Sequence, residues 1–236
     1  MEGRDPMLFS ERLKQKAKPI LHEIFDHPFV KGIASGTLPK EAITFYVQQD
    51  FQYLNAFVKL YAYAIIKSET REDMDFFKEQ IDYTLHSENM AHENLCQVAN
   101  LSYDTLKEGK IAPVTLLYQE HMLDQGVNGS LLDILACLIP CPWTYWEIGK
   151  RLVEQHPSLE NHPFKDWITF YGTYGNGELA FAEELFRRLN EKAGKASTKA
   201  LDQAEHVFLR SCELEWMFWE MAYYRQHWTF NDRIKI

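Results

Sequence analysis

The chain has 236 residues, a formal net charge of -9 and a hydrophobic content of 46%. Lysine and arginine are scattered along it, so the sequence lacks the clustered basic surface that tracks nucleic-acid phosphates. No apolar run approaches the roughly 18 residues of a membrane span, and the first residues have no apolar signal segment. We therefore expect a cytoplasmic protein that binds neither nucleic acid nor a membrane.

Helical periodicity dominates the sequence and strand signals are essentially absent, which predicts an all-α bundle of long, kinked helices. No linker or repeat divides the chain, so we expect a single domain over residues 1–236, with about 1–8 and 231–236 as tails or cloning remnants. In chain order, the predicted helices cover residues 10–25, 28–34, 40–67, 71–99, 113–125, 130–155, 164–190 and 197–227. The sixth should break at Pro140 and resume at Pro142, and glycines at 172, 175 and 177 should loosen the seventh.

Cys141 lies between two prolines in the sixth predicted helix. Proline suits the first position of a helix, so Pro142 would start a helix with Cys141 as its cap. A thiol facing a helix N-terminus has a lowered pKa and reacts as a nucleophile. The alternative is an inert, buried cysteine beside a structural kink.

Two carboxylates lie among aromatic residues on predicted helices. Asp50 shares a helix face with Tyr53 and is either a structural hydrogen-bond partner or a ligand-binding group. Glu215 shares a stripe with Phe218, and an apolar setting would raise its pKa into the range of a general acid. Pairing of Glu215 with an arginine or lysine is the alternative.

Ordered segments of the chain resemble the thiaminase II (TenA) family, in its cysteine-containing branch. These segments are HPFV (27–30), GTLP (36–39), YVQQDFQYL (46–54), PCPWTYWEIG (140–149), WITFY (167–171), EWMFW (215–219) and MAY (221–223), together with Glu88 and His92. The resemblance spans almost the whole chain. It implies a heme-oxygenase-like fold without heme, usually a homotetramer, acting on small aminopyrimidines or thiamin.

The same resemblance implies roles for individual residues. Cys141 would be the nucleophile and Glu215 the proton donor. Asp50 would bind the aminopyrimidine. The remaining expected substrate contacts are Tyr53, Tyr118, Tyr145, Tyr171 and Phe218, the last as a stacking wall.

These residue types suit one reaction, in which a thiolate adds to the pyrimidine ring and the 4-amino group then expels the substituent on the exocyclic methylene. We expect hydrolysis of 4-amino-5-aminomethyl-2-methylpyrimidine to the hydroxymethyl compound and ammonia. Thiamin cleavage to hydroxymethylpyrimidine and thiazole, in thiamin salvage, is the related activity. The four cysteines form no C-x-x-C pair, so neither a zinc site nor a disulfide framework is expected. We expect no metal and no cofactor.

Two alternative functions remain open from the sequence. A di-iron oxygenase on the same fold would draw ligands from His86, Glu88, His92 and Glu215, although ferritin-like sites use Glu-x-x-His pairs and none occurs here. A non-catalytic, pyrimidine-binding regulatory protein would need neither a nucleophile nor a proton donor, so Cys141 and Glu215 argue against it.

Overall fold

The structure is a computed structural model that describes residues 7–86, 89–106, 109–156, 158–173 and 178–230. Within these ranges every regular element is helical, which confirms the predicted all-α class. The helices are α1 (Phe9–Asp26), α2 (Pro28–Ser35), α3 (Lys40–Lys67), α4 (Arg71–His86), α5 (Asn89–Ala99), η1 (Tyr103–Thr105), α6 (Pro113–Asn128), α7 (Leu131–Leu138), α8 (Pro140–Gln155), α9 (Lys165–Gly172), α10 (Glu178–Ala193) and α11 (Thr198–Tyr224). None of them is long and apolar enough to cross a bilayer.

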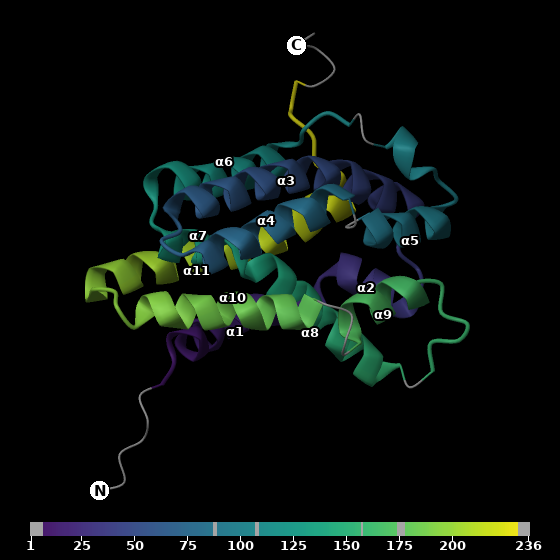
Figure 1. Ribbon diagram of the computed structural model, residues 1–236. Helices are drawn as coiled ribbons and strands as arrows, with labels where there is room; N and C mark the ends of the chain where they lie inside the picture. Colours follow the sequence, from purple (N-terminus) through teal and green to yellow (C-terminus); the bar gives the residue numbers. More distant parts are fainter. Residues whose placement is uncertain (1–6, 87–88, 107–108, 157, 174–177, 231–236) are drawn as a thin grey trace, which may run out of the picture.

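Helix α3 occupies the middle of the bundle, as its nearly continuous apolar surface predicts. It packs on α4, α5, α6, α7 and α11. Figure 1 shows α3 and α6 side by side along one edge of the molecule, with α1 and α10 side by side along the opposite edge. Helix α11 packs on both α1 and α3, and buried apolar side chains join the helices in one continuous core.

The junction between α7 and α8 differs from the prediction. Ile139, with φ of -60° and ψ of -41°, separates the two helices, and Pro140 rather than Pro142 is the first residue of α8. Cys141 is therefore the second residue of α8 and not its cap. Either proline can occupy a first turn because neither needs an N–H there. The chain takes the earlier one.

Two of the helices predicted from the sequence are each a pair of helices in the structure. Residues 71–99 form α4 and α5, and residues 164–190 form α9 and α10; residues 87–88 and 174–177, between the members of each pair, lie outside the described part. The helix ends at Gly172, since Thr173 has an extended backbone with φ of -100° and ψ of 130°. Gly175 and Gly177, which were also expected to loosen a helix, lie outside the described residues. Gly172 is the buried last residue of α9, and a Cβ there would lie 2.3 Å from the carbonyl oxygen of Gly149. The two glycines let α8 and α9 pack backbone against backbone.

Candidate active site

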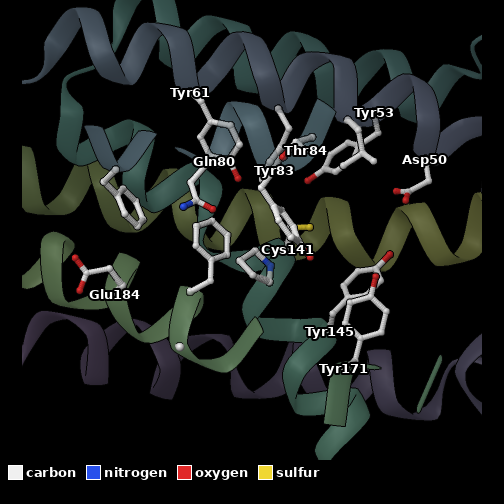
Figure 2. Close-up of a pocket in the computed structure, with 16 residues that line it drawn as sticks. Asp50, Tyr53, Tyr61, Gln80, Tyr83, Thr84, Cys141, Tyr145, Tyr171 and Glu184 are labelled. Carbon is white, nitrogen blue, oxygen red and sulfur yellow. The ribbon is translucent and has the colours of Figure 1, made fainter. Parts of the chain in front are cut away.

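A cavity of about 400 Å³ opens between α3, α4, α8, α9 and α10. Five of the eight residues predicted for the site line it: Asp50, Tyr53, Cys141, Tyr145 and Tyr171. They come from three helices far apart in sequence. Figure 2 shows Asp50, Tyr145 and Tyr171 at one end of the cavity, with Cys141 near its middle.

Cys141 is half-buried and is the one cysteine that lines the cavity. The other three cysteines are buried. The thiol lies in the first turn of α8, where a helix presents its positive end. Helical backbone hydrogen bonds, however, continue across the junction between α7 and α8. Ile139 N donates to Leu135 O, and Trp143 N donates to Ile139 O. Access to the cavity is therefore the stronger argument for a reactive thiol, and the argument from the helix dipole is weaker than the sequence suggested.

Tyr53 adjoins this thiol. Burial first, and then the charge of Cys141, raise the pKa of the Tyr53 phenol well above its ordinary value. Its hydroxyl oxygen is buried, and no group in the described part of the chain forms a well-aligned hydrogen bond with it. A buried hydroxyl without such a bond, on a cavity wall, is available to a ligand or to the thiol.

Asp50 is held by a side-chain relay that the sequence analysis missed. Its Oδ2 lies 2.6 Å from Nε2 of His92, and Nδ1 of His92 lies 3.2 Å from the hydroxyl of Tyr103. The His92 side chain is 3% exposed and that of Asp50 is 14% exposed. Asp50 therefore has the structural partner that one sequence reading expected, and it also lines the cavity. Its binding of a ligand stays a prediction. His92 was noted as a family residue and as a possible iron ligand, but nothing in the sequence pairs it with a residue 42 positions away.

Glu215 lies behind the cavity wall and does not line it. The residue is 3% exposed, and its Oε1 accepts a 2.6 Å hydrogen bond from the hydroxyl of Tyr118. Burial, helped by the charge of Asp50, raises the pKa of Glu215 to about 8, although the hydrogen bond from Tyr118 opposes the shift. The carboxyl therefore holds a proton at neutral pH, as its apolar stripe predicted. No ion pair involves it among the described residues.

Tyr118 and Phe218 also lie in this inner layer and not on the cavity surface. Both are buried, and their ring centroids lie 4.9 Å and 5.7 Å from that of Tyr53. They support the Tyr53 ring that forms the wall. Contact of Tyr118 or Phe218 with substrate remains a prediction.

Tyr145 and Tyr171 close the end of the cavity near Asp50. Their ring centroids are 5.0 Å apart, and the Tyr145 hydroxyl is 2.5 Å from that of Tyr46. Burial raises the pKa values of Tyr46 and Tyr145 well above the ordinary phenol value, so both rings are neutral hydrogen-bonding groups. The pocket end is thus aromatic and uncharged apart from the Asp50 carboxylate.

The opposite part of the cavity is formed by residues that the sequence analysis did not select. We call it the outer arm; its walls are Tyr61 of α3, Phe76 and Gln80 of α4, and Phe181 and Glu184 of α10. Figure 2 shows Tyr61, Gln80 and Glu184 on the side of Cys141 away from Asp50. Helical periodicity places Phe76 on the apolar face of its predicted helix. No feature of the sequence predicts that α4 and α10 face one another.

The iron ligands considered above do not gather into a site in the described residues. No group of three histidine, cysteine, aspartate or glutamate side chains suited to a metal occurs there. His86 is exposed and its Nδ1 lies 3.0 Å from the carbonyl oxygen of Asp82, whereas both ring nitrogens of His92 face Asp50 and Tyr103. Glu88 lies outside the described residues.

The whole chain is similar to proteins of known sequence and structure. An aminopyrimidine aminohydrolase of Halalkalibacterium halodurans is 35% identical over 226 residues, which cover 95% of this chain and all of that protein. A TenA homologue from P. horikoshii OT3 superposes with a TM-score of 0.78 at 26% identity, over 92% of this chain and 99% of the other. A Shewanella denitrificans domain of unknown function, described as having a heme oxygenase-like fold, shares the fold with a TM-score of 0.70 at 16% identity, over 91% of each chain.

The sequence match to a known family covers residues 14–225, from α1 to the end of α11. This range includes the cavity, its cysteine and both carboxylates. The chain belongs to the TENA/THI-4/PQQC family.

Proposed function

We propose that this protein is an aminopyrimidine aminohydrolase with thiaminase II activity. Its small-molecule substrates are 4-amino-5-aminomethyl-2-methylpyrimidine and thiamin, and its role is in thiamin salvage. The observation that carries the proposal is one cavity that holds a half-buried thiol and a carboxyl group, with the buried Glu215, whose pKa is raised by burial, directly behind its wall. The aminohydrolase relative, alike over nearly its whole length, supports it.

Each group returns to its starting state at the end of a turnover. The Cys141 thiolate forms a bond to the pyrimidine ring, and the electrons of the 4-amino group then expel the amine from the exocyclic methylene. Glu215 gives its proton to the departing nitrogen, so ammonia leaves as a neutral molecule. Water adds to the exposed methylene and returns a proton to Glu215. The sulfur–carbon bond then breaks and frees the hydroxymethyl product.

Asp50 binds the substrate and forms no covalent bond to it. Its carboxylate, oriented by His92, accepts hydrogen bonds from the 4-amino group and fixes the ring with the reacting carbon toward Cys141. The rings of Tyr145 and Tyr171 bound the pyrimidine at this end. Glu215 reaches the substrate once the Tyr53 and Tyr118 side chains shift about the bound ring, a small adjustment of the kind common when ligands bind.

The test is an assay of ammonia release from the aminomethyl pyrimidine, beside thiamin cleavage, in three forms of the protein. Wild type should turn over both compounds, and Cys141→Ala should lose about a thousandfold or more of kcat, as expected for loss of a covalent nucleophile. Glu215→Gln should lose kcat with KM nearly unchanged. Normal turnover by Cys141→Ala would disprove the proposal.

The same experiment separates the regulatory alternative. A protein that only captures pyrimidines would bind the aminomethyl compound, measured by calorimetry, and release no ammonia. We further propose that the enzyme works in the cytoplasm as a homotetramer, without a metal or other cofactor. Sedimentation analysis of the purified protein tests the assembly.

A further inference from the structure

One buried hydroxyl group near the Asp50 end of the cavity has no part in the proposed reaction. It belongs to Tyr46, which lies one turn before Asp50 on α3, is 2% exposed and does not line the cavity. Its oxygen lies 2.5 Å from the hydroxyl oxygen of Tyr145, which does line the cavity. Burying a polar group among apolar side chains is costly unless it is hydrogen-bonded, so this contact satisfies the Tyr46 hydroxyl.

Aromatic packing fixes both phenol rings of this pair. The Tyr46 ring is stacked on that of Trp219, with centroids 5.4 Å apart and planes 3° apart, and the centroid of the Phe29 ring lies 5.3 Å from its own. The centroid of the Tyr145 ring lies 5.0 Å from that of Trp219 as well. Close-packed rings leave only the two O–H bonds free to rotate, so the one remaining variable is which hydroxyl donates to the other.

The surroundings of the two hydroxyls decide the direction of this hydrogen bond. A phenol has one O–H to donate and lone pairs with which to accept. Within the described residues, Tyr145 is the sole hydrogen-bond partner of the Tyr46 hydroxyl, whereas Tyr145 lines the cavity and can also bond a ligand or water. A buried O–H left without an acceptor costs more than a lone pair left without a donor. Tyr46 therefore donates to Tyr145, and the proton of Tyr145 is left for the cavity.

We propose that Tyr46 is a positioning residue that makes the Tyr145 hydroxyl a hydrogen-bond donor toward the substrate ring. This inference rests on the proposed function. The Asp50 end of the cavity then presents one acceptor, the carboxylate of Asp50, beside one donor, the hydroxyl of Tyr145. A ligand ring that carries both an amino group and a nitrogen with a lone pair satisfies the two together. A hydroxyl that already accepts a hydrogen bond is also a stronger donor, so Tyr46 strengthens the contact that it orients.

Tyr46→Phe tests the proposal because it deletes the hydroxyl and keeps the ring on Trp219. Without the orienting hydrogen bond, kcat/KM for the aminomethyl pyrimidine should fall about fivefold to tenfold, mainly through KM. The same change made in Tyr145→Phe should alter kcat/KM by less than about twofold, because the donor that Tyr46 orients is already gone. Tyr63→Phe is the matched control, since Tyr63 is a half-buried tyrosine of α3 that does not line the cavity, and its kinetics should match those of wild type.

Thermal unfolding tests the direction of the hydrogen bond independently of catalysis. Tyr145→Phe removes the acceptor of the Tyr46 O–H and should lower the melting temperature, and adding Tyr46→Phe should recover part of the loss because the stranded donor disappears. A double variant that melts at or below the temperature of Tyr145→Phe would overturn the inference. Kinetic losses that multiply in the double variant would overturn it too, because packing alone produces them. A wild type that releases no ammonia at all would instead disprove the proposed function, and the melting temperatures would still decide the direction of the bond.

Discussion

Glu215 shows how burial determines the chemistry of a single residue. Its carboxyl is enclosed on α11, hydrogen-bonded to Tyr118, and carries a pKa of about 8 against an ordinary value of 4.5. The folded protein thus retains this proton at pH values where the unfolded chain has lost it. By linkage, stability contributed by the protonated form is lost as pH rises from about 4.5 to about 8.

Glu215→Gln should remove this pH-dependent loss while keeping a neutral acceptor for Tyr118. We expect the variant to gain stability relative to wild type at pH 8.5 by more than at pH 5, because only the wild type then holds a buried charge. Denaturant unfolding of both proteins at the two pH values measures the difference. An identical pH dependence in the two proteins would contradict the assigned protonation.

His92 should act as a positioning residue for Asp50. His92→Asn shortens the side chain and breaks the 2.6 Å contact, so we expect a tenfold to hundredfold loss of kcat/KM, mostly in KM because ring binding suffers first. Tyr103→Phe removes only the outer bond of the relay and should lose less. His92→Gln, whose amide can still approach Asp50, should recover part of the activity. Steady-state kinetics on the aminomethyl pyrimidine test the series, and unchanged KM in His92→Asn would contradict the role.

At the scale of the elements, the contact between α8 and α9 places Tyr171 in the site. Tyr145 and Gly149 lie one turn apart on α8, and Tyr171 directly precedes Gly172 on α9. A Cβ on Gly149 would lie 2.5 Å from the backbone nitrogen of Gly172. Real Cβ atoms do not approach backbone this closely, so any larger residue must push α9 away from α8.

Gly149→Ala should therefore cost about 2 kcal/mol of stability, in the range for overpacking a close contact. It should also lower activity, since Tyr171 moves with α9. Gly194→Ala is the control, because the nearest atom to a Cβ there is 3.6 Å away. Thermal unfolding and turnover of both variants give the answer, and equal behaviour of the two would argue against the close contact.

Helices α4 and α10 are joined through a buried ion pair beside the outer arm. Asp73 and Arg188 have side chains only 8% and 6% exposed, and Lys192 also reaches Asp73 at 3.1 Å. Although burial alone would raise it, the pKa of Asp73 is lowered by hydrogen bonds from Lys192 and Thr70. The stabilisation it contributes is present at neutral pH and is lost as pH falls below its ordinary value of 3.8.

Arg188→Met should destabilise the protein by about 3 kcal/mol, because it leaves the Asp73 carboxylate buried with one cation fewer. Arg187→Met on the same helix should cost no more than about 1 kcal/mol, since its side chain is 45% exposed. Denaturant unfolding at pH 7 compares the two. A similar cost for both would show that the Asp73–Arg188 pair does not hold α4 to α10.

At the scale of the whole molecule, the four cysteines differ in their access to solvent: three lie in the core and one lines the cavity. Cys96, Cys137 and Cys212 are buried, and burial raises the pKa of each, that of Cys137 to about 12. Cys141 faces the cavity. A thiol reagent should therefore modify one cysteine in the native protein and four after denaturation. Mass spectrometry identifies the site, and rapid native labelling of a second cysteine would contradict this division.

Some features of the site were accessible from the sequence because they are local. Glu215 next to aromatic residues on one helix face predicts a desolvated carboxyl, and proline-flanked Cys141 predicts a helix start within two residues of the true one. The apolar residues of α3 lie nearly all round the helix, and this pattern predicts its central position. Each of these depends on neighbours within a turn or two, and helical periodicity records such neighbours directly.

Other features depend on helices that meet only in the fold. His92 contacts Asp50, Tyr171 contacts Tyr145, and Phe181 faces Phe76, although 42, 26 and 105 positions separate the members of these pairs. Tyr118 and Phe218, expected to contact the substrate, lie one layer behind the cavity wall.

The sequence by itself determined the all-helical class and predicted a reactive Cys141 and two carboxylates of unlike setting, since residue type and helical spacing carry that information. Only the tertiary structure decided which groups face the cavity, which support its wall, and that the cavity extends past Cys141 into an outer arm. The physical reason is that a cavity is what remains after helices pack, and its walls are set by contacts between residues that no local pattern relates.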